Sequence, residues 1–231
     1  MITTVLFDLD GTLLPFEQDD FVKIYFSELC RKLAPMGYEP QHTVKSVWGG
    51  TKAMVMNDGS RLNSEAFWET FNAMNPGLPD ARPACDEFYT HEFEKAKASL
   101  KYIPDHRPMI ERLKSAGLRV VLATNPIFPL DGVRTRMAWV NLAPEDFGLV
   151  TWYDNSTPNP KYYQEILGKI GAAPEECIMV GNSVSEDMSA GTLGMDVFLA
   201  NEFVENPDSR DYSGYRQGSL DDAERYILEN R

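Results

Sequence analysis

The sequence predicts an α/β fold: a Rossmann-like parallel sheet with helices on both faces and an all-helical domain inserted after the first strand. Three observations predict it. Short apolar runs alternate with helical patterns along most of the chain. The stretch 16–100 breaks this alternation, because it has helical patterns and no convincing strand. Polar residues stand where several predicted strands end. Alternation of strand and helix is typical of a parallel sheet covered by helices.

The first predicted strand covers residues 3–8, a β-branched and apolar run that ends in an acidic residue. Such a run is typical of a strand that is buried on both faces. Further strands are predicted at 118–124, 148–153, 177–181 and 196–200, and helices between them at roughly 106–116, 131–141, 160–170 and 185–193. Gly117 and Gly171 are placed to end two of these helices, and Pro160 to open one.

The insertion is predicted to form four helices, around 18–34, 41–56, 63–74 and 84–99. Its aromatic residues are expected to build a core, because apolar stripes on helices usually face one. These residues are Phe21, Tyr25, Phe26, Trp48, Phe67, Trp68 and Phe71. The chain is therefore expected to contain an α/β core domain, 1–15 and 101–231, and a helical cap domain, 16–100. A final helix is predicted after Ser219, which can serve as its N-cap.

The composition argues against several classes of partner. The 231 residues carry a net charge of −13, which disfavours nucleic acid and anionic membranes as partners. No apolar run is long enough to cross a bilayer, and the N-terminal run lacks the basic flank of a signal peptide. Three cysteines without CxxC spacing predict neither disulfides nor a zinc site. The expected location is therefore the cytoplasm, and the expected partner a small molecule.

Residues suited to chemistry follow several of the predicted strands. Ligands of parallel α/β sheets bind at the carboxyl ends of the strands, so these residues should meet at one edge. They are Asp8 and Asp10 after the first strand, Thr124 and Asn125 after the second, Lys161 at the helix after the third, and Asn182, Glu186 and Asp187 after the fourth. A hydroxyl and a lysine suit phosphate oxygens, carboxylates suit Mg²⁺, and a carboxylate can also be a nucleophile. Each residue alone has a simpler explanation, such as a turn or a solvated surface side chain; their conjunction predicts a site.

With these residues the sequence resembles the haloacid dehalogenase superfamily, in particular phosphatase-like members with a helical C1-type cap. The resemblance spans the whole chain, and the cap is its least specific part. Residues 8–13, Asp-Leu-Asp-Gly-Thr-Leu, match the first motif of the family. Thr124 matches the second motif, Lys161 within 157–163 the third, and residues 180–187 the acidic fourth.

The resemblance implies a magnesium-dependent phosphatase that hydrolyses a small phosphomonoester through an aspartyl phosphate. Asp8 would attack phosphorus. Asp10 would protonate the leaving oxygen and then deprotonate the attacking water. Thr124 and Asn125 would bind phosphate oxygens, and Lys161 would neutralise charge at Asp8 and at the phosphate. The cap would close over the site and select the substrate.

The implied metal site shows one departure from the family. Mg²⁺ would be held by the Asp8 carboxylate, the Asp10 main-chain carbonyl and Asp187. The family usually has aspartate at the position of Asn182, and an amide brings no charge. Asp187 is therefore expected to carry more of the metal binding, with Asn182 either a direct ligand or a neighbour of one. The alternative is that Glu186 takes the place of Asn182 in the metal site.

Other functions stay open at this stage. A phosphomutase would share all four motifs, whereas a dehalogenase of the superfamily needs no acid such as Asp10 for a halide leaving group. A response-regulator receiver would have adjacent acids and a shorter chain. A catalytically weak interaction protein of the same fold remains a candidate because of Asn182. The substrate is not predicted beyond a small phosphorylated metabolite; Lys52 and Arg61 of the cap are candidate contacts for a second anionic group.

Overall fold

The core of the molecule is one six-stranded parallel sheet. The computed structural model describes residues 1–156 and 161–231. The strands are β1 (Thr4–Phe7), β2 (Arg119–Leu122), β3 (Leu149–Val150), β4 (Cys177–Gly181), β5 (Asp196–Ala200) and β6 (Gln217–Gly218), in the order β3-β2-β1-β4-β5-β6. The predicted α/β class is thus confirmed. The predicted strand at 148–153 is shorter than expected, and β6 was not predicted.

The central strand β1 is the one that leads into the acidic run. Phe7, its last residue, is in register with Leu122 of β2 and with Val180 of β4. The carboxyl ends of these three strands therefore meet at one edge of the sheet. All four residues of β1 are buried, because helices cover both faces of the sheet.

The two faces of the sheet are covered by different helices. On one face lie α5 (Arg107–Ser115), α6 (Leu130–Ala138) and α8 (Leu220–Glu229); on the other lie α7 (Tyr162–Ile170) and the 3₁₀ segment η5 (Asp187–Leu193). Side chains of β1 alternate between them, since Phe7 packs in the first cluster and Leu6 in the second. Two short 3₁₀ turns, η3 (Pro144–Asp146) and η4 (Pro174–Glu176), precede β3 and β4. The predicted start of a helix at Pro160 lies outside the described residues.

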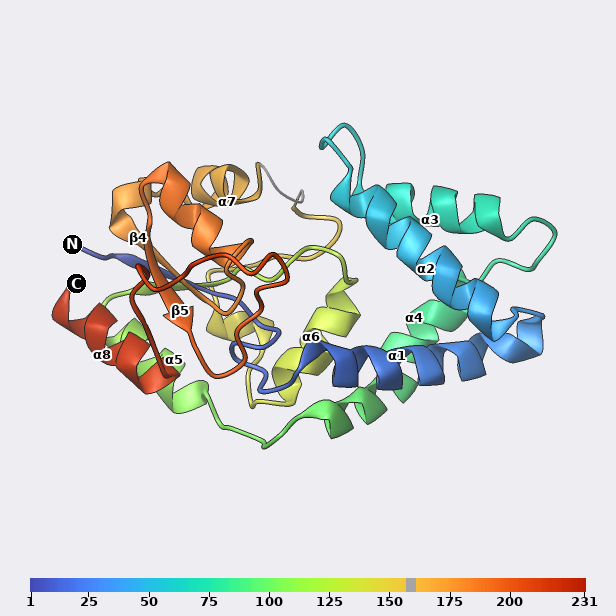
Figure 1. Cartoon of the computed structure of the whole chain (residues 1–231), viewed down its shortest axis with the longest axis horizontal. Helices are drawn as coiled ribbons and strands as arrows, with labels where there is room; N and C mark the ends of the chain where they lie inside the picture. The colour runs from blue at the N-terminus through green and yellow to red at the C-terminus, as the bar shows by residue number, and fades with distance from the viewer. Residues whose placement is uncertain (157–160) are drawn as a thin grey trace.

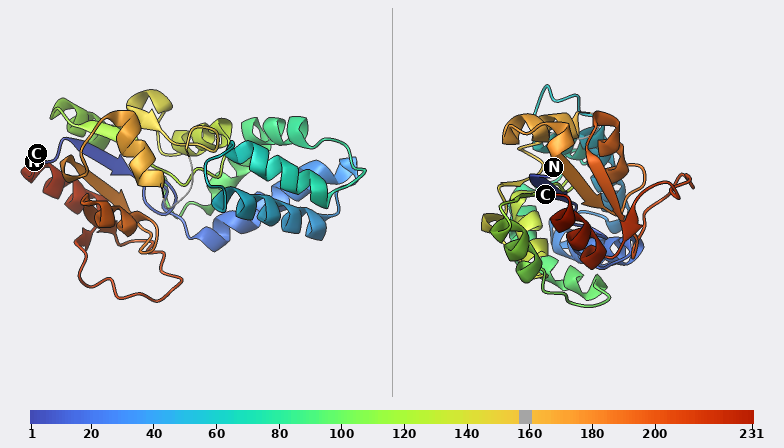
Figure 2. Two further views of the ribbon diagram at one scale, coloured as in Figure 1. Left: turned by 90° about the horizontal axis from the view of Figure 1, so that it is seen from above. Right: turned by 90° about the vertical axis from the view of Figure 1, so that its left-hand side faces the viewer.

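The region between β1 and α5 is helical and lies to one side of the sheet (Figures 1 and 2). It comprises α1 (Gln18–Leu33), η1 (Ala34–Met36), α2 (Pro40–Val55), α3 (Asn63–Met74), α4 (Arg82–Thr90) and η2 (Glu92–Ser99). Most of its aromatic side chains pack into the core as expected, with Phe21 and Phe71 almost fully buried. Trp48 is an exception, because half of it is exposed. No helix of the described residues is long and apolar enough to cross a membrane.

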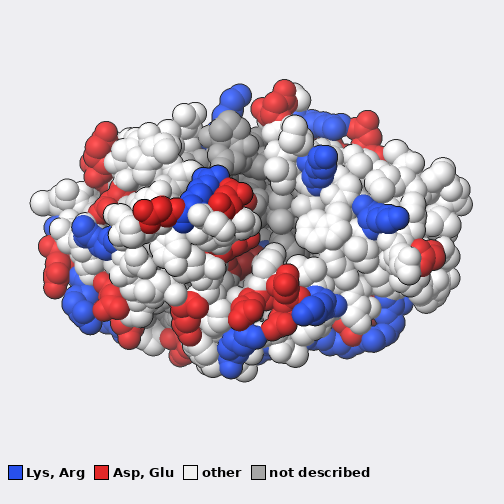
Figure 3. All heavy atoms as spheres, in the orientation of Figure 1, with Lys and Arg blue, Asp and Glu red and all other residues white. Residues whose placement is uncertain are grey.

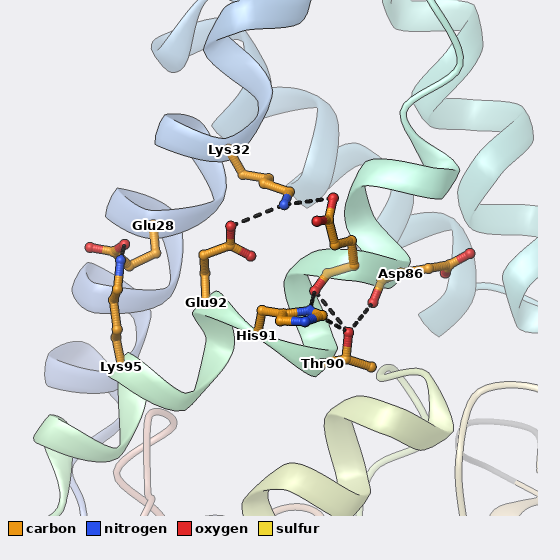
Figure 4. Close-up of polar contacts among 8 residues, drawn as sticks. Glu28, Lys32, Asp86, Thr90, His91, Glu92 and Lys95 are labelled. Atoms are coloured by element: carbon orange, nitrogen blue, oxygen red, sulfur yellow. Dashed lines mark hydrogen bonds and ion pairs between the residues drawn. The ribbon is translucent and has the colours of Figure 1, made fainter.

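The single helix predicted at 84–99 is wrong, because the chain breaks at His91 (φ −128°, ψ −76°). The Thr90 hydroxyl donates to the Glu87 carbonyl at 3.0 Å, and the His91 ring contacts the same oxygen at 3.0 Å. These local side-chain contacts compete with helix continuation. Lys32 of α1 joins the two segments across the break, through Glu87 at 2.9 Å and Glu92 at 3.0 Å (Figure 4).

Candidate active site

Asp8 stands immediately after β1, at the start of a tight turn. Its amide donates to the Val180 carbonyl at 2.9 Å, which extends the pairing with β4 by one residue. The turn requires Gly11, whose φ is +79°. A Cβ atom at Gly11 would lie 2.1 Å from Asn182 Nδ2. Glycine at this position therefore lets the turn close against the end of β4.

The Asp8 carboxylate is buried in an acidic environment. The Thr12 hydroxyl donates to Asp8 Oδ2 at 3.1 Å and to Asn182 Oδ1 at 3.3 Å, sharing its hydrogen between them. Burial raises the pKa of Asp8 well above its ordinary value, and the negative charges of Asp187 and Asp10 raise it further. A cation beside Asp8 would offset this charge and favour the ionised form that a nucleophile needs.

Asp187 reaches the same place from the end of β4. It is 5% exposed, and its Oδ2 accepts from the Ser183 amide at 2.8 Å. A Cβ atom at Gly181 would lie 2.2 Å from that oxygen, so glycine permits the close approach. Burial raises the pKa of Asp187, and the charges of Glu186 and Glu205 add to the effect. Asp8 and Asp187 are thus two buried carboxyl groups with raised pKa values at the same edge of the sheet.

Asn182 is held by hydrogen bonds at both ends of its side-chain amide group. Its Nδ2 donates to the Phe203 carbonyl at 2.7 Å, and its Oδ1 accepts from the Thr12 hydroxyl. The side chain therefore ties the turn after β1 to the segment after β5. Its part in metal binding stays a prediction.

Most of the predicted site residues line one cavity of about 160 Å³ at the carboxyl edge of the sheet. The predicted residues that line it are Asp8, Asp10, Thr124, Asn125, Asn182, Glu186 and Asp187. Glu205 lines it too and was not predicted, because the segment after β5 carries no periodic pattern. Among the described residues no lysine or arginine lines this cavity. Figure 3 shows acidic side chains set back in the hollow between the two parts of the molecule.

Asn125 and Glu186 form one wall of this cavity. Asn125 Nδ2 donates to Glu186 Oε2 at 3.1 Å. Asn125 Oδ1 is buried and has no hydrogen-bond partner among the described residues. Next to it Thr124 is 1% exposed, and its carbonyl accepts from the Thr151 hydroxyl at 2.7 Å and the Tyr162 hydroxyl at 2.8 Å. The loop after β2 is therefore fixed in position by its main chain.

Lys161 is not brought to the cavity. It is exposed and occupies the N-cap position of α7. Its charge makes a small contribution to the lowered pKa of Asp58 in the helical region 18–99, the predicted cap; that lowering arises mainly from hydrogen bonds with Ser60. The rest of the predicted third motif, residues 157–160, lies outside the described residues. In the cap, Lys52 is exposed and Arg61 pairs with Glu69.

The donor set fits a hard cation. Among the described residues no three His, Cys, Asp or Glu side chains lie close enough together to hold a metal ion by themselves. The set implied by the family needs only two carboxylates, Asp8 and Asp187, and the main-chain carbonyl of Asp10. Both carboxylates are buried with raised pKa values, and the charge of Asp187 adds to the raised pKa of Asp8. Oxygen ligands with an uncompensated negative charge are what Mg²⁺ prefers.

No sequence pattern predicted Arg136, which pairs with Asp10. This arginine of α6 is fully buried, and its Nη1 donates to Asp10 Oδ2. It follows the exposed Arg134 by two residues, so in sequence it looks like one of the basic residues that commonly lie on the surface of a helix. Nothing in the local pattern distinguishes the two residues, because the partner of Arg136 is more than a hundred residues away in sequence.

The cap contacts the core beside the cavity through Asn63, the first residue of α3. Its Nδ2 donates to the carbonyls of Pro126 and Ser156, each at 3.1 Å. Its Oδ1 accepts from Asn57 Nδ2 at 2.7 Å. Asn63 is only 1% exposed, because it lies where the start of α3 meets the loops that contain Pro126 and Ser156. Its amide therefore acts as a latch between the cap and the loop that follows Thr124.

Asn63→Ala should weaken this latch. The substitution removes three hydrogen bonds and leaves two carbonyls without their donor, so we expect the free energy of unfolding to fall by about 1–3 kcal/mol. Urea denaturation followed by circular dichroism measures the change. The matched control is Asn72→Ala on the exposed side of the same helix, which should change stability by less than about 0.5 kcal/mol. Equal effects of the two substitutions would contradict the latch.

The family model for haloacid dehalogenase-like hydrolases matches residues 2–193 of this chain. Curated relatives of similar length agree with that match. The chain is 25% identical to the pyrophosphatase PpaX of Bacillus pumilus, over 84% of this chain and 80% of that protein. It is 24% identical to a phosphoglycolate phosphatase of Aquifex aeolicus, over 81% of this chain and 78% of that protein.

Solved structures share the fold over almost the entire length. A HAD phosphatase from Thermococcus onnurineus aligns over 98% of both chains, with a TM-score of 0.58 and 20% identity. The L-2-haloacid dehalogenase of Xanthobacter autotrophicus aligns over 98% of both chains with a TM-score of 0.58 and 16% identity. The expected family is confirmed: this chain belongs to the haloacid dehalogenase-like hydrolases, is similar to the phosphatases among them, and is itself a hydrolase.

Proposed function

We propose that this hydrolase is a Mg²⁺-dependent phosphatase that cleaves a small phosphomonoester through an aspartyl phosphate on Asp8. The observation that carries the proposal is the arrangement at the end of β1. Asp8, Asp10 and Asp187 line one cavity with the Thr124–Asn125 loop. A nucleophile, a proton carrier and a second metal-binding carboxylate are the groups that this reaction requires.

The first step forms the intermediate. An Asp8 carboxylate oxygen attacks phosphorus, and the bond from phosphorus to the leaving oxygen breaks as Asp10 gives its proton to that oxygen. The Thr12 hydroxyl, 3.1 Å from Asp8 Oδ2, fixes one carboxylate oxygen and so leaves the other to attack. In the second step Asp10 takes a proton from water, the water oxygen attacks phosphorus, and the bond to Asp8 breaks.

Charge has to be balanced for an anionic ester to enter so acidic a cavity. Mg²⁺ held by Asp8, Asp187 and the Asp10 carbonyl would supply positive charge that screens the nucleophile from the phosphate. Asn125 lines the cavity beside Thr124, and the second hydrogen of its Nδ2, which already donates to Glu186, would bind a phosphate oxygen. Lys161 takes part only if its side chain turns inward from its exposed position, so its role depends on a movement of the start of α7.

The relatives support phosphorylated compounds as the substrate class, and one of them supports a phosphate ester. Those compared by sequence are named as a pyrophosphatase and a phosphoglycolate phosphatase. We propose a small phosphorylated metabolite, enclosed between the cavity and the cap. All three cysteines are buried and unpaired, which supports activity in the cytoplasm.

The proposal is tested by comparing the release of inorganic phosphate from phosphate esters with the release of halide from a haloacid. The purified protein with Mg²⁺ is expected to release inorganic phosphate from members of a panel of phosphorylated metabolites and from 4-nitrophenyl phosphate. With 2-chloropropionate we expect no chloride release, because Asp10 supplies a proton that an oxygen leaving group needs and a halide does not. Phosphate is measured colorimetrically and chloride by ion chromatography. Chloride release without phosphate release would replace the phosphatase with a dehalogenase, and release of neither would favour an interaction protein.

A further inference from the structure

Arg136 is immobilised on three sides. Its Nε donates to the Gly132 carbonyl at 3.2 Å, one helical turn earlier in α6. The centre of its guanidinium group lies 4.0 Å from the centroid of the Phe128 ring. Its Nη1 donates to Asp10 Oδ2. Its side chain is fully buried, so these three contacts restrict where the guanidinium group can lie.

This fixed cation divides the two oxygens of Asp10 into different roles. Oδ2 is occupied by Arg136. Oδ1 is buried and has no hydrogen-bond partner among the described residues. Asp10 itself lines the cavity that contains Asp8. A buried polar atom without a partner is costly, and a catalytic role is one explanation for such an atom.

We propose that Arg136 is a positioning residue that aims Asp10 Oδ1 at the leaving oxygen of the substrate. The inference rests on the proposed phosphatase function and adds the group that orients its proton carrier. With Oδ2 occupied by Arg136, Oδ1 is the oxygen left to give a proton to the leaving group. After that proton moves to the leaving oxygen, the same Oδ1 faces the water that hydrolyses the aspartyl phosphate.

The geometry of α6 makes this role specific to Arg136. Arg134, two residues earlier, points away and pairs with Asp131 on the surface, where its side chain is 53% exposed. A residue that serves only to fill space beside the Phe128 ring would not need a guanidinium group. Arg136 instead places a charged, five-donor group against one oxygen of one carboxylate.

The test compares two esters that differ in their need for a proton. Phenyl phosphate has a basic leaving oxygen, whereas the nitro group of 4-nitrophenyl phosphate stabilises the departing anion. We expect Arg136→Met to lower kcat/KM for phenyl phosphate by about 100-fold, the scale of a lost general acid, and for 4-nitrophenyl phosphate by less than about fivefold. The ratio kcat/KM is used because it reports the steps up to departure of the leaving group. Arg134→Gln, the matched control, should change neither value.

Each outcome decides the inference. An equal loss on both esters would show a structural role and overturn it, and so would no loss on either. Thermal unfolding by circular dichroism shows whether the Met variant is folded. If it is not, Arg136→Lys decides with the same pair of esters: a selective loss on phenyl phosphate supports positioning, and no selectivity refutes it. If the parent protein releases phosphate from neither ester, or Asp8→Asn is as active as the parent, the proposed function itself fails and this inference fails with it.

Discussion

Asp8→Asn is expected to lower kcat for phosphate release by at least about 10⁴-fold, because an amide oxygen is too weak a nucleophile to form the phosphorylated intermediate. The fold should survive. The amide oxygen still accepts from the Thr12 hydroxyl. The substitution also removes a buried carboxyl group whose pKa is raised by burial and by the charges of Asp187 and Asp10. The apparent melting temperature without metal should therefore be equal to or higher than that of the parent. Steady-state phosphate release and circular dichroism measure the two effects.

The matched control for that substitution is Asp19→Asn, an exposed carboxylate in the first turn of α1. It carries the same change of atoms and charge outside the Asp8 cavity, so turnover should stay within about twofold of the parent. Mass spectrometry of the acid-quenched parent adds a direct readout, since a phosphoryl group should appear on the peptide that contains Asp8. Parent-like turnover by Asp8→Asn would rule out the aspartyl phosphate.

Removal of divalent metal is expected to abolish turnover, and added Mg²⁺ to restore it. Without metal, two buried carboxylates with raised pKa values face each other at the sheet edge. The folded protein then binds protons more tightly than the unfolded chain does. The contribution of these two carboxylates to stability is therefore fully present at low pH and is lost as the pH rises from the ordinary carboxylate pKa through the raised values. Mg²⁺ replaces those protons, so its stabilising effect should grow with pH.

A melting experiment measures that competition. Mg²⁺ at about 100 times its Kd should stabilise the fold by about 2.7 kcal/mol at pH 8, and by much less at pH 5. Asp187→Asn should remove most of the difference between the two pH values, because it removes one of the two titrating carboxylates. Turnover that resists chelator, or a Mg²⁺ effect that is larger at pH 5, would refute the metal assignment.

The sequence could predict the parts of this site that local patterns encode. The strand before Asp8 is a continuous apolar run, and strand ends of a parallel sheet meet at one edge, so the convergence of Asp8, Thr124 and Asp187 followed from order along the chain. Helix starts with local chemistry were also predictable, as at Ser219, whose side chain caps α8 by accepting from the Asp222 amide.

Contacts between distant segments were outside that reach. Arg136 and Arg134 look alike in sequence, and only the packing of α6 against the turn after β1 buries one of them. Glu205 comes to the cavity through an isolated pairing with Ser183, in a stretch without periodicity. The orientation of the Asn182 side chain depends on Phe203, because Asn182 Nδ2 donates to the Phe203 carbonyl. The exposed position of Lys161 likewise depends on how the start of α7 is oriented, which no local pattern describes.

The strand order has a consequence for biosynthesis. β1 is made first, yet its neighbours in the sheet, β2 and β4, begin at residues 119 and 177. At the usual pace of translation, roughly 10–30 s pass between synthesis of β1 and synthesis of β4. During that interval the helices 18–99 can already pack locally, while the strand that carries Asp8 waits without its second partner. A nascent chain is therefore inert toward phosphate esters until most of its length has been made.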